Sequence, residues 1–340
     1  QGHAGAKGST YRSGVLIVVG VTVEPQLIRT CSIWRALEVV GDAPTVLVIE
    51  AIWLGTRRFD ALRKRTGLLK ALLSDRLKRL IANGMIEKCL SSDGGNRHEY
   101  VLTQKGRDLY WTSLMLLRWE QRWGAGRTKL RVELTHKSCG HVFEPEPACK
   151  ACNQTIDATQ MEWEPGPGVG MMEPVYSRRR QQRETTESAA TLFDEAARIM
   201  GDRWASLIMR SIFTNINRFD DIRRDTAIAT NILAERLAWL TSIGVIRQEQ
   251  YIESPPRFEY RLRRKGVDYY PALLMLMMWG DKYFCSPNGP PVLLTHRNCG
   301  HRLEPQVVCS HCRQPLEAHD VDFRLIEVAG AEDERQPVSA

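Results

Sequence analysis

The sequence predicts a mainly α-helical fold with small β-sheets, built from two tandem copies of one winged helix-turn-helix domain, each followed by a small cysteine-rich module. Three observations support this prediction. A cysteine-histidine cassette occurs twice, as HKSCGHVFEPEPACKAC at 136–152 and as HRNCGHRLEPQVVCSHC at 296–312, at an offset of 160 residues. The same offset pairs other residues along most of the chain without a gap. Within a copy, apolar spacing and turn residues give the order helix, helix, short helix, helix, hairpin, helix.

Each element of copy one has its own sequence signature. Helical apolar spacing marks 32–41, 44–55, 59–66 and 70–83, and Asn83-Gly84 ends the last of these helices. Two short runs, 85–91 and 98–103, are joined by turn residues at 92–96 and predict a hairpin. A long helix is expected from about Gly106 to Trp123. This is the order of elements in a winged helix-turn-helix domain.

The repeat also sets the expected domain boundaries. Subtracting 160 pairs Arg58-Phe59-Asp60 with Arg218-Phe219-Asp220, and Trp119 with Trp279. The segment 165–186 is rich first in Gly and Pro and then in charge, which is typical of a linker. The expected segments are a tail at 1–26, winged helix-turn-helix domain 1 at 27–125, module 1 at 126–164, the linker at 165–186, domain 2 at 187–286, module 2 at 287–326 and a tail at 327–340.

Composition narrows the class of protein. A chain of 340 residues can bury two cores, and 43% hydrophobic with 26% charged residues is ordinary for globular proteins. The formal net charge of +7 favours an anionic partner through a local basic surface. Nine cysteines are too few for a disulfide scaffold, so we expect a cytoplasmic protein whose cysteines bind metal. No apolar run approaches the roughly 20 residues of a membrane helix, so we expect no membrane association and no targeting signal.

The two cassettes predict structural zinc. Each has a His-x2-Cys pair followed by a Cys-x2-Cys pair, and zinc in structural sites takes four such ligands in a tetrahedron. We expect two zinc ions per chain, one in each zinc-ribbon-like module. His141 and His301 are alternatives to the first histidine, and disulfides are the alternative to metal. No open coordination position or general base is evident, so we expect no enzyme activity. The expected ligands are His136, Cys139, Cys149, Cys152, His296, Cys299, Cys309 and Cys312.

Several stretches carry a resemblance to a known family. RRFDALRKRTG (57–67), LLSDRLKRLIANGMIEK (72–88) and RHEYVLTQKGRDL (97–109) resemble the HxlR-type transcriptional regulators of bacteria, as do their copy-two counterparts. The resemblance implies sequence-specific binding to double-stranded DNA. Because family members act as symmetric dimers, it also implies a covalent pseudo-dimer within one chain, which allows further dimerisation. The fusion and the cassettes depart from the family, and copy one has Gly41-Asp42-Ala43-Pro44 where copy two keeps the family's GxxW at 201–204.

The helices at 70–83 and 230–240 are the expected DNA-reading helices. Leu73, Leu77, Leu80 and Ile81 form the expected core stripe of the first. In a helix-turn-helix, N-terminal residues of this helix contact bases and flanking cations contact phosphates. Solvated helix faces are the alternative, and pairing with a nearby glutamate is the alternative for the wing arginines. The expected DNA-binding residues are Arg58, Lys70, Ala71, Ser74, Arg76, Lys78, Arg97, Arg218, Thr230, Asn231, Arg236 and Arg257.

Two further expectations concern regulation and the balance between the copies. Copy one has more basic residues in its helix-turn-helix, so we expect it to supply most of the DNA-binding free energy. Cys31 precedes the first helix at a position where the family often has a cysteine, which some members use as a thiol sensor; a packed core cysteine is the alternative. The resemblance therefore allows an oxidant or a small-molecule effector. The rival function is a protein-interaction adaptor of the transcription machinery.

Overall fold

The computed structural model describes residues 27–91, 97–124, 130–173, 192, 194–254 and 256–327. The expected N-terminal tail, the turn of the first wing and most of the linker lie outside these residues. Of the expected C-terminal tail, only residue 327 lies within them.

Both copies contain the expected winged helix-turn-helix elements, and the elements correspond at an offset of 160 residues. The predicted long helix after Gly106 is divided into a short helix and a long one, α5 and α6. Copy one comprises α1 (Ser32–Val40), α2 (Ala43–Trp53), α3 (Phe59–Thr66), α4 (Lys70–Ala82), β2 (Ile86–Leu90), β3 (His98–Leu102), α5 (Gln104–Arg107) and α6 (Tyr110–Trp123). Copy two comprises α7 (Glu195–Met200), α8 (Arg203–Phe213), α9 (Phe219–Thr226), α10 (Thr230–Ser242), β9 (Ile246–Ile252), β10 (Arg257–Leu262), α11 (Arg264–Val267) and α12 (Tyr270–Phe284).

Local sequence explains how these helices begin and pack. The Asp42 carboxylate caps α2 by accepting a hydrogen bond from the Thr45 amide, as aspartate does at many helix N-termini. Leu73, Leu77 and Leu80 anchor α4 in the core with at most 2% of each side chain exposed. Ile81 was expected in the same stripe, but it is 39% exposed. The stripe therefore follows the narrower spacing of three and four residues and leaves Ile81 at its edge.

The two copies pack against each other through their first and last helices. Helix α1 of copy one contacts α12 of copy two, while α6 contacts both α12 and α7. The approach of α1 to α12 is close, because a Cβ atom at Gly280 would lie 2.3 Å from the Ser32 carbonyl oxygen. Reciprocal bonds repeat across the interface: the Trp119 indole donates to the Lys265 carbonyl, and the Trp279 indole donates to the Lys105 carbonyl. The interface therefore obeys the same 160-residue symmetry as the sequence.

The cassettes are not two separate modules, which corrects the predicted organisation. Strand β4 (Leu130–His136) of copy one pairs with β5 (His141–Phe143) and with β13 (Val321–Glu327) of copy two. Reciprocally, β7 (Met161–Pro165) of copy one pairs with β11 (Val292–His296) of copy two. Strand β6 (Pro145–Cys149) pairs with its own counterpart, β12 (Pro305–Cys309). Short turns η1 (Ala158–Gln160) and η2 (Ala318–Asp320) precede the exchanged strands. Each sheet thus combines strands of both copies.

The first part of the expected linker is ordered against copy two. The amides of Gly166 and Gly168 donate to the carbonyls of Pro291 and Pro290. Strand β8 (Met171–Met172) then pairs with β1 (Ile28–Arg29), ahead of the first helix. The Gly-Pro stretch therefore brings the backbone of the expected linker into hydrogen-bonding contact with copy two, and the boundary at 165, where β7 ends, stays a prediction.

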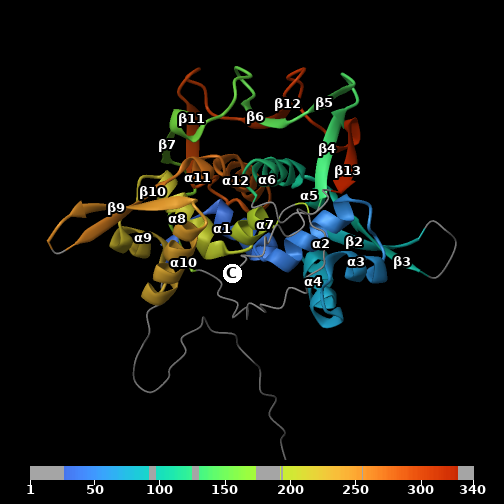
Figure 1. The fold of residues 1–340 in the computed structure, drawn as a ribbon, viewed down its shortest axis with the longest axis horizontal. Helices are drawn as coiled ribbons and strands as arrows, with labels where there is room; N and C mark the ends of the chain where they lie inside the picture. The colour runs from blue at the N-terminus through green and yellow to red at the C-terminus, as the bar shows by residue number, and fades with distance from the viewer. Residues whose placement is uncertain are drawn as a thin grey trace, which may run out of the picture.

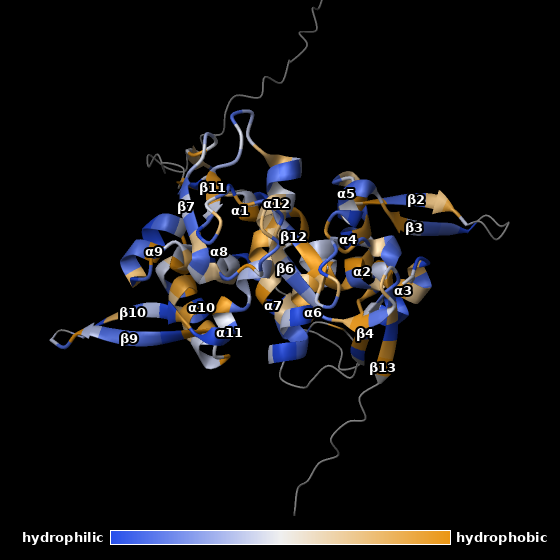
Figure 2. Cartoon of the chain, turned by 90° about the horizontal axis from the view of Figure 1, so that it is seen from above, coloured by the Kyte–Doolittle hydropathy of each residue, from blue (hydrophilic) through white to orange (hydrophobic). Residues whose placement is uncertain are grey.

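The arrangement separates the recognition helices from the cassettes. In Figure 1, α4 and α10 lie along the lower edge, and the cassette strands lie along the upper edge. The two wings, β2–β3 and β9–β10, project from opposite ends of the molecule in both views (Figures 1 and 2). No helix in the described part of the chain has the length and apolar character that crossing a bilayer requires.

Candidate metal centres and nucleic-acid interface

The eight expected metal ligands form two tetrads, but each tetrad joins both cassettes. Residues His136 and Cys139 of copy one meet Cys309 and Cys312 of copy two. The other tetrad contains Cys149, Cys152, His296 and Cys299. The expectation that each cassette fills its own site is therefore corrected. The exchange follows from strand pairing, because β13 places the end of cassette two beside β4, and β7 places the end of cassette one beside β11.

The spacing within the tetrads fits a tetrahedral zinc ion. Zn–S bonds of about 2.3 Å and Zn–N bonds of about 2.05 Å separate two sulfurs by about 3.8 Å and a sulfur from a nitrogen by about 3.6 Å. The sulfurs of Cys139 and Cys309 are 4.0 Å apart, and those of Cys149 and Cys299 are 3.9 Å apart. The His296 Nδ1 atom lies 3.4 Å from the Cys299 sulfur. These two groups could each hold a metal ion through Nδ1 and three sulfurs.

The surroundings of the histidines separate the two candidate ligands in each cassette. Both His136 and His296 are fully buried, and Nε2 of His136 lies 2.9 Å from an Asp320 carboxylate oxygen. A carboxylate behind a ligating histidine orients the ring and is common at zinc sites. By contrast, Nδ1 of His141 and of His301 contacts the carbonyl oxygen of the preceding cysteine, at 2.7 and 2.9 Å. These alternatives lie outside the tetrads, although His141 stacks on His311 near Cys139.

The thiols differ in how readily they ionise. A hydrogen bond from the His301 backbone amide lowers the pKa of Cys299 to about 6. Burial raises the pKa of Cys149 and of Cys309. Because metal binding requires thiolates, a metal ion entering these sites would release protons from the buried pair.

The N-terminal part of α4 presents the expected DNA-reading residues to solvent. Lys70 and Ala71 are exposed in the first turn, Ser74 is half-buried one turn later, and Lys78 is exposed. Lys70 and Lys78 have no ion-pair partner among the residues that the structure describes. In copy two, Thr230 and Asn231 occupy the exposed first turn of α10. These residues therefore lie on accessible faces of the two helices.

Arg76 and Arg236 are engaged within their own domains. The Arg76 guanidinium bonds to the Asp42 carboxylate at 2.7 Å, with 12% and 13% of the two side chains exposed. Arg236 contacts Asp202 in the same way. Each aspartate also caps the N-terminus of the helix that follows it, so the arginine joins the recognition helix to α2 or α8. Both arginines therefore pair with acidic groups of their own domain, including the exposed Asp75 and Glu235, and their contact with phosphates stays a prediction.

The remaining arginines differ in their partners. Arg58 lies 3.4 Å from the Glu99 carboxylate. The exposed Arg218 lies over the Tyr251 ring at 4.6 Å. Arg97 and Arg257 are exposed beside the turns that connect the strands of the two wings. Pairing with a nearby glutamate, the alternative considered for the two wing arginines, is thus found for Arg58 instead.

The charge contrast between the copies persists in three dimensions. In copy two, Arg223 and Arg224 pair with aspartates on their own helix, at one helical turn. In copy one, the corresponding Arg63 and Lys64 are exposed and have no ion-pair partner within the described residues. Copy one therefore presents more uncompensated positive charge around its recognition helix.

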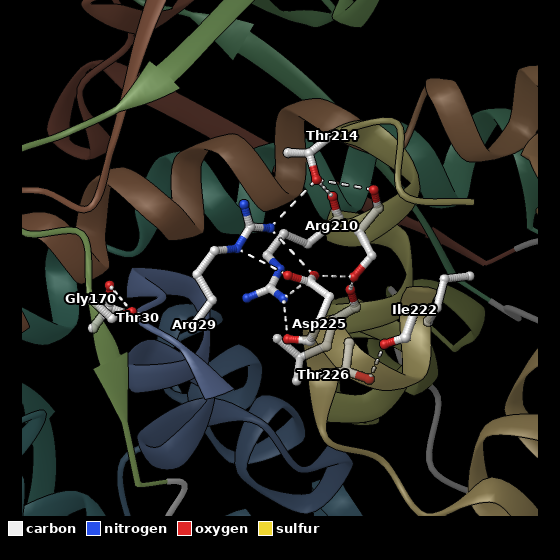
Figure 3. Close-up of polar contacts among 10 residues, drawn as sticks. Arg29, Thr30, Gly170, Arg210, Thr214, Ile222, Asp225 and Thr226 are labelled. Atoms are coloured by element: carbon white, nitrogen blue, oxygen red, sulfur yellow. Dashed lines mark hydrogen bonds and ion pairs between the residues drawn. The ribbon is translucent and has the colours of Figure 1, made fainter. Parts of the chain in front are cut away.

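Sequence reasoning missed a buried charged cluster beside Cys31. Cys31 is 5% exposed at the N-terminus of α1 and lines a cavity shared by both copies. Arg29 and Arg210 line the same cavity and converge on Asp225, as Figure 3 shows. The only signal in the sequence was a reversal of charge, because Glu50 and Arg65 stand where copy two has Arg210 and Asp225.

Together, the paired helix-turn-helix units, the wings and the exposed basic helices define the class of winged-helix DNA-binding transcriptional regulators. Comparison with known sequences specifies the family. The sequence model of the HxlR-like helix-turn-helix family matches residues 39–128 and 199–287, which is more than half of the chain. The protein belongs to this family and contains two copies of its domain.

Individual proteins are similar to parts of this chain. An uncharacterized HTH-type transcriptional regulator of Mycobacterium tuberculosis is 37% identical over 126 residues, covering 37% of this chain and 80% of the relative. The HTH-type transcriptional regulator YdeP of Bacillus subtilis is 31% identical over 86 residues, covering 25% of this chain and 67% of the relative. The solved structure of PA1607, a candidate transcription factor, has 33% sequence identity and a TM-score of 0.34, covering 41% of this chain and 95% of that one.

Proposed function

We propose that this protein is a sequence-specific transcriptional regulator in which one chain binds both halves of its DNA site. The observation that carries the proposal is the placement of α4 and α10 along one edge, with the wings at opposite ends (Figure 1). The reciprocal helix interface between the copies supports it, because a regulator of two half-sites needs two reading heads held at a fixed spacing. The function requires no catalysis, and the reduced cysteines suit the cytoplasm.

The two reading heads contribute unequally in this proposal. Lys70 and Lys78 approach the DNA from α4, where Lys70 can reach guanine acceptors and Lys78 a phosphate. In copy two, Asn231 can read an adenine edge, with few uncompensated cations beside it. Copy one therefore supplies most of the electrostatic free energy, and copy two supplies mainly alignment. The DNA site is correspondingly asymmetric.

Structural zinc in both tetrads would fasten the copies together. Each tetrad takes two ligands from each cassette, so each ion closes a loop of more than a hundred residues. Bound metal would stabilise the folded chain and fix the relative placement of the two copies. The metal has no catalytic part in the proposal, because all four positions are filled by protein ligands.

The test begins with footprinting on the DNA upstream of the protein's own gene. Fluorescence anisotropy at several salt concentrations then compares Lys70→Ala, Lys78→Ala and Asn231→Ala with the wild type. The expected result for Lys78→Ala is a salt slope smaller by roughly one unit, because one phosphate contact is lost. Lys70→Ala and Asn231→Ala should each relax selectivity at one base pair, by about 1–3 kcal/mol.

A matched control is Lys150→Ala, which removes an exposed lysine that directly follows β6, a strand on the opposite edge from α4 in Figure 1. It should bind DNA like the wild type. If the wild type shows no preference for the upstream DNA over unrelated DNA, the proposal fails. The adaptor function would then be favoured, in which the same surfaces contact transcription proteins.

A further inference from the structure

A cavity lies where the two copies meet, on the copy-two side of the interface. Its volume is about 100 Å³, and residues from β1, α1, α8, α12, β7 and β11 contribute to its lining. Aromatic and methionine side chains form much of the wall: Trp163, Phe213, Tyr270 and Met277. The cavity has about two thirds of the volume of an apolar cavity that accepts benzene, which is about 150 Å³.

Two arginines line one end of this cavity and share the carboxylate of Asp225. Arg210 bonds to the Asp225 carboxylate at 2.6 Å, and Arg29 approaches the same carboxylate at 3.1 Å. Both guanidinium groups are oriented toward Asp225 in Figure 3. Asp281, a further lining carboxyl group, already accepts a hydrogen bond from Ser32. One carboxylate therefore serves two cations in this cluster.

Arg210 has unused hydrogen-bonding capacity. Arg210 is 8% exposed, and its Nε and Nη1 atoms are buried without a hydrogen-bond partner among the described residues. Buried guanidinium donors are normally paired, since leaving them unpaired costs free energy. The lining of the cavity thus combines an apolar wall with a guanidinium group that bonds to Asp225 through Nη2 and leaves Nε and Nη1 without a partner in the part of the chain that the structure describes.

We propose that this cavity binds a small aromatic carboxylate, with its ring among Trp163, Phe213 and Tyr270 and its carboxylate on Arg210. A carboxylate accepts two parallel hydrogen bonds from a guanidinium group, which would satisfy the unpaired donors. The ligand ring would pack against the faces and edges of these aromatic side chains, and such contacts between aromatic rings are favourable.

The copy-one counterpart should not bind the same ligand. Glu50 replaces Arg210 there, and its carboxylate already accepts a hydrogen bond from the Leu192 amide. A buried carboxyl group at this position would repel an anionic ligand. The inference is therefore one ligand per chain, in the copy-two cavity.

The cavity is also connected to the second helix-turn-helix. Asp225 lies in the last turn of α9, two residues before Ala227, which adopts the left-handed conformation that ends the helix. The Ser211 hydroxyl also bonds to Asp225. A ligand that engages Arg210 would therefore act on the residue that links the cavity to the turn before α10.

The test uses 4-fluorobenzoate as the probe and measures its binding to the full chain by fluorine NMR and calorimetry. Neutral 4-fluorobenzamide is the matched control for charge. We expect one 4-fluorobenzoate per chain, bound at least about tenfold more tightly than the amide. Arg210→Gln should remove that preference. Met277→Trp, which leaves the arginine cluster intact, should fill the cavity and abolish binding of both compounds.

Three results would overturn the proposal. They are no 4-fluorobenzoate binding by the wild type up to about 10 mM, equal affinity for the acid and the amide, and unchanged binding by a folded Met277→Trp variant. Because the readout is ligand binding alone, it is independent of DNA binding.

Discussion

The exchange of ligand pairs between the cassettes can be tested by counting metal ions in double variants. The two tetrads predict that Cys139 and Cys309 serve one site, although they belong to different cassettes. Cys139 and Cys149 belong to one cassette but serve different sites. Removing one cysteine from a four-ligand zinc site should abolish stable binding at that site, because structural zinc needs all four ligands.

The expected metal contents follow from this assignment. The wild type should bind about two zinc ions per chain, and Cys139→Ser about one. The double variant Cys139→Ser/Cys309→Ser should still bind about one, since both changes damage the same site. In contrast, Cys139→Ser/Cys149→Ser should bind none.

Elemental analysis of protein purified without chelator gives these contents, and circular dichroism confirms that each variant is folded. Cys89→Ser is the control, because its sulfur contacts the Glu99 carbonyl, away from both tetrads, and it should retain both ions. Sites that each lay within one cassette would reverse the pattern of the double variants. That reversal, or a metal-free wild type, would refute the reasoning.

Three further predictions concern stability and charge. Burial raises the pKa of Glu50 to about 7 in the folded chain, so its protonated form stabilises the fold at low pH and this contribution is lost as the pH rises from about 4.5 through 7. Urea titrations at several pH values should show that Glu50→Gln reduces this loss in the free energy of unfolding by up to roughly 3 kcal/mol. Arg76→Ala should lower the free energy of unfolding by about 3 kcal/mol and leave the salt slope of DNA binding unchanged, since its partner is the shielded Asp42. A smaller salt slope in a folded Arg76→Ala variant would instead indicate that Arg76 contacts a phosphate. Trp119→Phe should destabilise the chain by about 1–3 kcal/mol in thermal or urea unfolding by leaving the Lys265 carbonyl without its donor, and unchanged stability would contradict the importance of that contact.

The helices and wings could be predicted from sequence because their signals are local. Apolar spacing, turn residues and the 160-residue offset placed the order of elements, and the structure differs mainly at edges such as the break between α5 and α6. The ligand residues were also predictable, since each pair is separated by two residues. How the pairs combine was not predictable, because both combinations contain the same ligands and spacers. Strand exchange between copies decides it, and that is a property of tertiary packing.

The structural arginines illustrate a second limit of the sequence. Arg76 occurs at a position on α4 that suits a phosphate contact, and its spacing gives no sign of the Asp42 partner 34 residues earlier. The parallel Asp202–Arg236 pair at the repeat offset was the available signal. The cavity was missed for a different reason. Arg210 and Asp225 have counterparts of opposite charge in copy one, so the repeat conceals the site instead of revealing it.

The claim that one chain reads both half-sites is tested most directly by the mass of the protein–DNA complex. A fragment carrying the full footprinted site would be titrated with protein, and light scattering would give the number of chains bound at saturation. The account predicts one chain per fragment, with protection over two adjacent major-groove segments. Two chains on the same fragment, or one chain protecting a single half-site, would contradict it.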